Sequence, residues 1–245
     1  MRMGAGRRRR LTVVLVLVVV LAAVLVAADR GAAWYAERRL AEETATWATR
    51  AGAEPGTEPA VHVEGFPFLD QVVRGRYDGV AISVRDVGTG GLIASRLDIH
   101  LTGVDLPFAD LTAGDLSHAH ADRVTATAHI PLSEFQTALS PRGVKLRVQS
   151  GRLRVEVPFE IAGFKSTVSG LADVEADGGR LRLRLTDLAA AGAPLPQSAA
   201  DAVSRQLASI IEAPKLPYGL VLDQVRVTPA GLVATASGRN VTLSS

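Results

Sequence analysis

The 245-residue chain contains no cysteine, and this absence excludes two kinds of covalent linkage. The chain has neither a disulfide framework nor a cysteine that could carry a lipid anchor. Aromatic residues are scarce as well, at 4% of the chain, whereas 47% of its residues are hydrophobic. A chain of this length and apolar content buries a sizeable core, so we expect one folded domain with an appendage.

An excess of positive charge is absent from most of the chain, although the calculated pI is about 9.3. Residues 1–28 hold five arginines, at 2 and 7–10, and no acidic residue. Removing these five from 27 Lys and Arg leaves 22, against 25 Asp and Glu, so the remainder carries a formal charge of −3. Binding to a phosphate backbone needs positive charge gathered on the folded surface, and we therefore expect no nucleic-acid partner.

Motifs for nucleophilic catalysis and phosphate binding are also missing. The chain has no GxSxG elbow, no GxxxxGK[ST] loop and no GxGxxG that opens a helix. Ser95, Ser133 and Ser169 have no basic partner that spacing alone assigns. We therefore expect a protein that is not an enzyme and needs no cofactor.

One group of histidines and carboxylates keeps a catalytic alternative open. The stretch DLSHAHAD, residues 115–122, places His118 and His120 two apart, so that on a strand both share a face. Two histidines and a carboxylate can bind zinc or iron. A solvated loop explains this weak spacing more simply, but a metal-dependent hydrolase using His118, His120 and Asp122 stays as an alternative.

A long apolar run follows the N-terminal arginines. Residues 1–10 form a basic tail, and residues 11–28 (LTVVLVLVVVLAAVLVAA) are apolar except for Thr12. At about 1.5 Å per residue this run makes a helix of about 27 Å, enough to cross a hydrocarbon core. The arginines favour the cytoplasmic side, so we expect a single-pass anchor with the C-terminal domain outside the cytoplasm. Residues 26–28 (VAA) also fit a cleavage site, which would release an exported domain.

Residues 29–59 are predicted to be a stalk helix and a linker. The sequence AAWYAERRLAEETATWATR, residues 32–50, contains good helix formers and neither Gly nor Pro, and AGAEPGTEP then breaks the helix. Residues 60–245 are the predicted folded domain.

Within residues 60–245 the dominant hydrophobic period is two, which is typical of strands with one apolar face. Three pairs of strands are joined by short turn sequences, QSGR at 149–152, DGG at 177–179 and TPAG at 228–231. The predicted strands centre on residues 80–84, 97–101, 124–130, 144–148, 153–157, 172–176, 181–185, 225–227, 232–234 and 241–243.

Two helices are predicted among these strands. Residues 131–140 (PLSEFQTALS) form a short one, and residues 197–212 (QSAADAVSRQLASIIE) form a longer one with an apolar stripe. Antiparallel strands with few helices give the α+β class. Because each strand has one apolar face and no βαβ rhythm is present, we expect a strongly curved antiparallel β-sheet, a cup wrapped on one long amphipathic helix.

Proline precedes an aromatic residue at four places beside strand patterns, at 67–68, 107–108, 158–159 and 217–218. Proline cannot donate to a ladder, so each pair is interpreted as a strand end or edge with its ring turned to one face. Such rings are either core plugs at the rim of the sheet or the lining of an apolar mouth. The basic residues at 145, 147, 152, 154, 180, 182 and 184 form either a solvated sheet face or a contact to anionic headgroups.

Four stretches carry a family resemblance: GFPFLDQVVRGRYDGVAISV (65–84), DLPFADL (105–111), VTATAHIPLSEFQTAL (124–139) and LPYGLVLDQVRVTPAGLVATASGRNVTL (216–243). Together they resemble the actinobacterial LmeA-like family, whose members are described as phospholipid-binding. The resemblance covers about Val61 to Leu243 together with the N-terminal anchor. It implies a curved sheet wrapped on a helix, similar to the tubular lipid-binding folds, and it supplies no catalytic residues.

The resemblance implies a lipid-contact role for Phe66, Pro67, Phe68 and Leu69. An apolar cavity between sheet and helix would hold acyl chains, because each CH₂ group removed from water contributes roughly 0.8 kcal/mol. The predicted lining is Phe66, Phe68, Leu69, Val80, Ile82, Phe135, Val203 and Leu207.

We therefore expect an extracytoplasmic phospholipid-binding protein of the cell envelope that supports envelope lipid or lipoglycan assembly. Its expected partners are phospholipid and the membrane. The alternative is a scaffolding module that stabilises an envelope biosynthetic enzyme by protein contact, with Phe66 and Phe68 as exposed anchors.

Overall fold

The computed structural model describes residues 5–50, 54–55, 59–89, 92–113, 115, 117–161, 164–190, 193–195 and 216–243, and within the first of these ranges the side chains of residues 18–42. Its helices are α1 (Ala5–Arg50), α2 (Phe68–Arg74), α3 (Phe108–Ala113) and α4 (Leu132–Leu139), with short 3₁₀ turns η1 (Ser140–Arg142) and η2 (Pro217–Gly219). Its strands are β1 (Glu54–Pro55), β2 (Ala60–Glu64), β3 (Arg76–Thr89), β4 (Leu92–Asp105), β5 (His120–Pro131), β6 (Lys145–Gln149), β7 (Arg152–Ile161), β8 (Phe164–Asp177), β9 (Arg180–Ala190), β10 (Ala193–Pro194), β11 (Val221–Thr228) and β12 (Gly231–Thr242).

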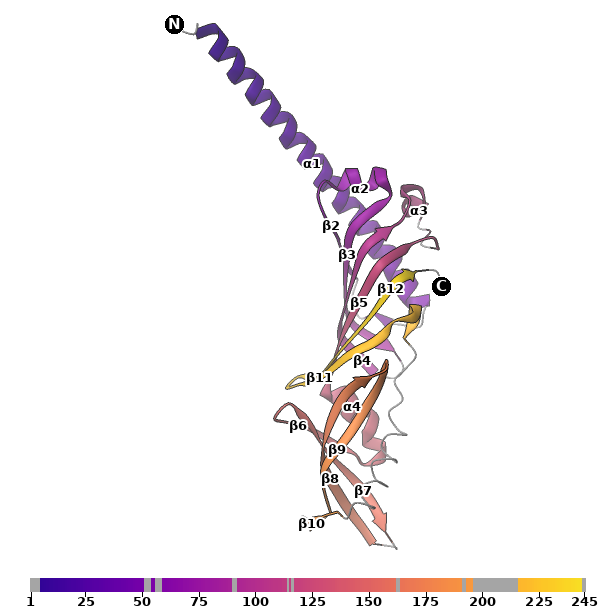
Figure 1. Ribbon diagram of the computed structural model, residues 1–245. Coiled ribbons are helices and arrows are strands. Elements are labelled where there is room, and N and C mark those ends of the chain that lie inside the picture. The colour runs from indigo at the N-terminus through magenta and orange to yellow at the C-terminus, as the bar shows by residue number, and fades with distance from the viewer. Residues whose placement is uncertain are drawn as a thin grey trace.

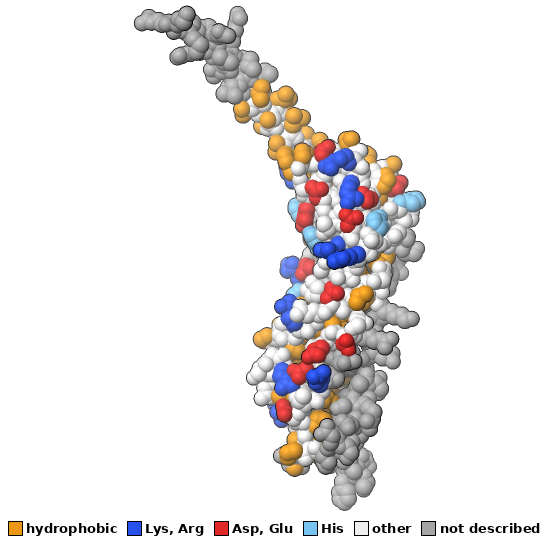
Figure 2. Space-filling model, in the orientation of Figure 1, with side chains coloured by type: hydrophobic (Ala, Val, Ile, Leu, Met, Phe, Trp, Pro, Cys, Tyr) orange, Lys and Arg blue, Asp and Glu red, His pale blue; other side chains and the backbone are white. Residues whose placement is uncertain are grey.

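The predicted membrane run and the predicted stalk belong to one continuous helix, α1, of 46 residues. Side chains 18–28 are all exposed, whereas Asp29, Ala33 and Ala41 are buried. The helix therefore projects from one end of the domain (Figure 1), and the described side chains of the projecting part are hydrophobic (Figure 2). Among the described residues α1 contains the one stretch that is long and apolar enough to cross a membrane.

The described strands form two antiparallel sheets. Sheet A has seven strands in the order β1-β3-β4-β5-β12-β11, with β2 also paired to β3, and sheet B has five in the order β10-β9-β8-β7-β6. Mostly antiparallel strands with few helices agree with the predicted α+β class. The predicted single cup is not confirmed, because the strands are divided between two sheets that follow one another along the molecule (Figure 1).

Sequence alternation did not reveal this division because strands of both sheets have the same period of two. The chain leaves sheet A after β5, builds sheet B from β6 to β10, and returns to sheet A with β11 and β12. The predicted amphipathic helix at 197–212, with Val203 and Leu207, lies outside the described residues.

All three predicted turn connections are confirmed by the strand register. The turns join Gln149 to Arg152, Asp177 to Arg180 and Thr228 to Gly231 as paired residues. In the first two turns both central residues have positive φ, 51° and 74° at 150–151 and 58° and 79° at 178–179. Positive φ at both positions is the requirement of a type I′ hairpin. The predicted separate strand at 241–243 is wrong, because β12 continues to Thr242 along β5.

Helix α4 confirms the predicted helix at 131–140 and attaches sheet B to sheet A. The Gln136 side chain accepts a hydrogen bond from the Leu146 N–H (2.7 Å) and donates one to the Val144 carbonyl (2.9 Å). Phe135 packs against the cluster that includes Val144, Leu153 and Val225. The helix therefore holds the start of β6 against the strands that close sheet A.

Several basic positions of sheet B pair with acidic positions in the strand register. Arg152 forms two hydrogen bonds of 2.6 Å with Asp173, and it also donates to the Thr186 hydroxyl. In the register of β8 and β9, residue 173 pairs with 184, 175 with 182 and 177 with 180. Each of these three register pairs therefore combines one basic and one acidic residue in the sequence.

Three of the four Pro-aromatic pairs lie at the start of a helical turn, which corrects their interpretation as strand ends. Phe68 is the first residue of α2, Phe108 that of α3, and Pro217 that of η2. Proline has no N–H to donate and its fixed φ suits the residue that opens a helix. The fourth pair lies inside β7.

Candidate functional site

The stretch FLDQVVR forms the short helix α2, which is capped from another part of the chain. Pro67 occupies the N-cap position with φ −73° and ψ 143° and provides no side-chain cap. The Leu69 N–H instead donates a 2.7 Å hydrogen bond to the carboxylate of Asp29 in α1. At the other end, Gly75 adopts a left-handed φ of 64°, and its N–H bonds to the last turn.

The two phenylalanines of GFPFL have opposite environments. Phe68 is 4% exposed and packs beside Tyr77, with ring centroids 6.2 Å apart. Phe66 is 61% exposed, and the Arg30 guanidinium lies 5.3 Å from its ring centre. Phe68 is therefore a core residue and not an exposed anchor for a scaffolded partner, while Phe66 remains on the surface.

Gln71 connects α2 with the two strands beside it. Its side chain is 1% exposed; the amide nitrogen donates to the Glu64 carbonyl (3.1 Å), and the amide oxygen accepts from the Asp78 N–H (2.8 Å). Both polar ends of this buried side chain are thus satisfied. Gln71 fixes α2 to the end of β2 and the start of β3.

The part of α1 that follows Asp29 covers the inner face of sheet A. Ala32, Ala36 and Leu40 recur every four residues, which places them on one side of the helix, and they pack against the buried cluster of sheet A. Glu37 accepts a 3.0 Å hydrogen bond from the Val63 N–H of β2. Since β2 pairs only with β3 among the described strands, α1 satisfies a donor on its open edge.

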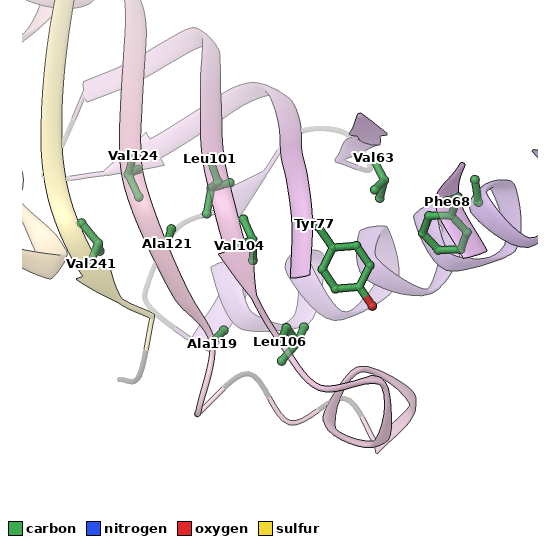
Figure 3. Packing of buried hydrophobic residues seen from close by; sticks show 11 residues of the cluster. Val63, Phe68, Tyr77, Leu101, Val104, Leu106, Ala119, Ala121, Val124 and Val241 are labelled. Atoms are coloured by element: carbon green, nitrogen blue, oxygen red, sulfur yellow. The ribbon is translucent and has the colours of Figure 1, made fainter. Parts of the chain in front are cut away.

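An apolar cavity of about 80 Å³ lies between α1 and sheet A. Two of the residues that line the cavity belong to α1 and one belongs to α2. The others come from sheet A and the segments beside it. Figure 3 shows several of them on the inner face of the strands. The lining consists of Ala36, Leu40, Val61, Val63, Phe68, Tyr77, Val80, Ile82, Leu101, Val104, Leu106, Ala119 and Leu243.

The size of the cavity sets what it can accept. An apolar cavity of about 150 Å³ is large enough to bind benzene, and this one is smaller. With α1 in its present position the cavity accommodates the end of an acyl chain and not its full length.

Tyr77 is the one lining residue of this cavity whose side chain carries a polar atom. Tyr77 is 4% exposed, and its hydroxyl has no hydrogen-bond partner among the described residues. Burial raises the pKa of this hydroxyl above its ordinary value, so that it stays protonated. A buried hydroxyl without a partner costs about 1–3 kcal/mol.

The structure brings together only some of the residues predicted for the site. Phe68, Val80 and Ile82 line the cavity. Phe66, Pro67 and Leu69 are exposed outside it, and Phe135 packs in the separate cluster between α4 and sheet B.

Sequence reasoning missed the cavity residues that α1 contributes, Ala36 and Leu40, and it missed Tyr77. The four-residue spacing of Ala32, Ala36 and Leu40 in the predicted stalk is the signal that was available for the helix. It indicates a helix face that packs against something, and the stalk interpretation left that face without a partner.

The histidine group does not form the donor set that a metal-dependent hydrolase requires. His118 lies in a turn before β5, with its Nδ1 3.5 Å from an Asp110 carboxylate oxygen. Asp122 pairs with Arg76 at 2.6 Å. In the part of the chain that the structure describes, no group of three or more His, Cys, Asp or Glu side chains is placed to hold a metal ion.

Comparison with known families gives one match. The profile of the LmeA-like phospholipid-binding family matches residues 27–237. The match begins just before the packed part of α1 and ends in β12, so that it includes both sheets and the helix that covers sheet A. No curated protein and no solved structure matches the chain.

Proposed function

Because the chain belongs to the LmeA-like phospholipid-binding family, we propose that it binds a phospholipid acyl chain between α1 and sheet A. The observation that carries this proposal is the cavity. All its lining residues have apolar side chains except Tyr77, whose ring carries a hydroxyl. Each methylene group that enters the cavity gains roughly 0.8 kcal/mol.

Helix α1 forms the wall that moves when a longer chain enters. Its contacts with sheet A come mainly from alanines, Ala32, Ala33 and Ala36, whose small side chains bury little apolar area. Among the described residues its polar attachments in this region come from Asp29, Arg30 and Glu37. A shift of α1 away from sheet A widens the cavity without disrupting the strand ladders.

The domain acts at the outer surface of the cytoplasmic membrane, held there by α1. The support for this location is the exposed apolar part of α1 together with the arginines that precede it. In this setting the protein takes part in envelope lipid or lipoglycan assembly by holding a lipid, and it carries out no covalent chemistry of its own.

The test uses the full chain in lipid nanodiscs that contain a phospholipid with a photoactivatable group at the end of one acyl chain. After irradiation, peptide mass spectrometry identifies the residues that carry the lipid. We expect adducts on cavity residues such as Phe68, Val80 and Leu101, in addition to residues 18–28 of α1. Adducts confined to residues 18–28 would show contact with the surrounding bilayer alone and would overturn the proposal.

A further inference from the structure

Helix α2 has an apolar side that the core does not use. Phe68 and Gln71 point into the domain and are buried, whereas Leu69 and Val73, four residues apart, are 42% and 86% exposed. Phe66 immediately before the helix is 61% exposed. We call Phe66, Leu69 and Val73 the α2 outer face. Three exposed large hydrophobic residues within eight positions indicate a surface made for contact with an apolar medium.

A fourth exposed hydrophobic residue lies at the same end of the domain. Phe108, the first residue of α3, is 51% exposed. The two segments are joined directly, because the Leu106 N–H donates a 2.9 Å hydrogen bond to the carbonyl of Gly75, at the end of α2. Figure 1 shows α2 and α3 together at the end of the domain from which α1 projects. Phe108 therefore extends the α2 outer face across this end.

The position of α2 along α1 coincides with the end of the apolar run. The exposed apolar part of α1 ends at residue 28, and the next residue, Asp29, binds the Leu69 N–H of α2. One residue of helix corresponds to about 1.5 Å of height. When residues 11–28 span the hydrocarbon core, α2 is therefore level with the boundary between hydrocarbon and headgroups.

The charged groups around the α2 outer face suit that boundary. Arg30 and Arg74 keep 45% and 55% of their side chains exposed. Their neighbouring carboxylates, Asp29 and Asp70, are paired with them at 2.9 and 2.6 Å. Arginine side chains at such a boundary extend toward headgroups while their stems lie along apolar surface.

We propose that the α2 outer face and Phe108 insert into the interface of the same bilayer that α1 crosses, an inference that rests on the proposed membrane attachment. Phe68 and Leu106, which line the cavity, are within two residues of Phe66 and Phe108 in sequence. Insertion of this end places the cavity beside the acyl region. A lipid then moves between bilayer and cavity beside α2 and α3 without crossing water.

The absence of cysteine allows a direct test with single labelled positions in the full chain, reconstituted in phosphatidylglycerol-containing vesicles. Val73→Cys carries an environment-sensitive fluorophore on the α2 outer face. Ile93→Cys, at 47% exposure, is the matched control, since it lies at the opposite end of β4, twelve residues before Asp105 and roughly 40 Å away at ~3.3 Å per residue. Val20→Cys, at 55% exposure, reports the anchor itself.

Lipids with a spin label near the headgroup quench a fluorophore at position 73 when it lies in the interface, and lipids with a spin label at the end of the acyl chain quench a fluorophore at position 20, in the middle of the 11–28 span. We expect a blue-shifted emission and strong quenching at position 73, and neither change at position 93. Quenching at position 20 without quenching at position 73 would overturn insertion of the α2 outer face while leaving the anchor in place. Quenching at neither position would overturn both the anchor and this inference, whereas photolabelling of the cavity would still test lipid binding separately.

Discussion

The Leu69 N–H donates a 2.7 Å hydrogen bond to the Asp29 carboxylate, which joins α2 to α1 across 40 residues of sequence. The bond satisfies one of the free N–H groups at the start of a helix whose N-cap residue is a proline without a capping side chain. The bond also fixes Asp29 as the residue of α1 at which the helix leaves the domain.

Removing this cap should loosen α2 specifically. In Asp29→Ala the Leu69 N–H loses its acceptor, and loss of a cap costs about 1–2 kcal/mol. Hydrogen exchange measured by mass spectrometry should then show amides 68–74 exchanging about 5–30 times faster. Asp70→Ala is the control, because Asp70 is also in the first turn of α2 but is exposed and pairs with Arg74. Equal acceleration in both variants would contradict the capping role.

The two phenylalanines of GFPFL should differ in their effect on stability. Phe68→Ala empties a buried position and should lower the free energy of unfolding by about 3–5 kcal/mol. Phe66→Ala changes an exposed side chain and should stay within about 0.5 kcal/mol of the parent protein. Thermal unfolding followed by circular dichroism compares the two variants. Similar losses in both would show that the present division between core and surface is wrong.

Tyr77→Phe should separate stability from lipid binding. The hydroxyl has no partner in the described part of the free protein, so its removal should leave stability unchanged or raise it by about 1 kcal/mol. Affinity for phospholipid should change less than about twofold, because the hydrocarbon end of an acyl chain offers no hydrogen-bond acceptor to this hydroxyl. Titration with a fluorescent phospholipid measures this affinity. Tyr35→Phe, on an exposed ring of α1, should change neither quantity.

Alkaline conditions should destabilise the protein through Tyr77. Burial raises the pKa of this hydroxyl in the folded state above the ordinary value of 10.0. The folded protein therefore holds this proton more tightly than the unfolded chain does. The resulting contribution to stability is complete below pH 10 and is lost as the pH rises from 10 through the folded-state pKa. Unfolding measured across this range should show a smaller decline for Tyr77→Phe than for the parent, and identical declines would argue against a buried hydroxyl.

Filling the cavity should weaken lipid binding without weakening the fold. Ala36→Leu adds three carbons to the wall that α1 contributes, and a side chain that fits an empty space commonly stabilises by about 0.5–2 kcal/mol. The same side chain occupies the position of the acyl chain, so uptake of fluorescent phospholipid should decrease. Ala27→Leu makes an equal change on the exposed part of α1 and should leave uptake unaltered. Undiminished uptake by Ala36→Leu would place the lipid elsewhere.

The hairpins were predictable from sequence because their determinants are local. Ser150-Gly151 and Gly178-Gly179 supply the positive φ values that a two-residue turn needs, and alternating apolar residues on each side define the strands. Helix α4 was predictable for a similar reason, since Leu132, Phe135 and Leu139 mark one face of a single helix.

Helix α2 was not predictable in the same way because its determinants are distant. Seven residues are too few to display a helical period, and an isolated helix of this length is unstable in water. Asp29 caps it from α1, and Gln71 attaches it to β2 and β3. Without these tertiary contacts on view, the proline at 67 favoured a strand end, and Phe66 and Phe68 were assigned to one mouth.

The cavity was only partly predictable. Alternation placed Val80 and Ile82 on an inward face, but the covering helix came from a segment interpreted as a stalk. The residues that pack it, such as Ala33 and Ala36, have short side chains whose burial produces little hydrophobic signal in the sequence. Which helix covers which sheet depends on long-range packing that periodicity does not encode.

The continuity of α1 limits where the domain can search for its lipid. A flexible linker of n residues would let a domain range over about 5–6 Å × √n from its attachment point, but α1 passes from its exposed apolar part into its packed part with no interruption. A domain held in this way does not sweep through the surrounding aqueous space. With α1 anchored in a bilayer as proposed, it encounters lipids by lateral diffusion in the plane of that bilayer, so the frequency of its encounters depends on their surface density and not on their concentration in solution.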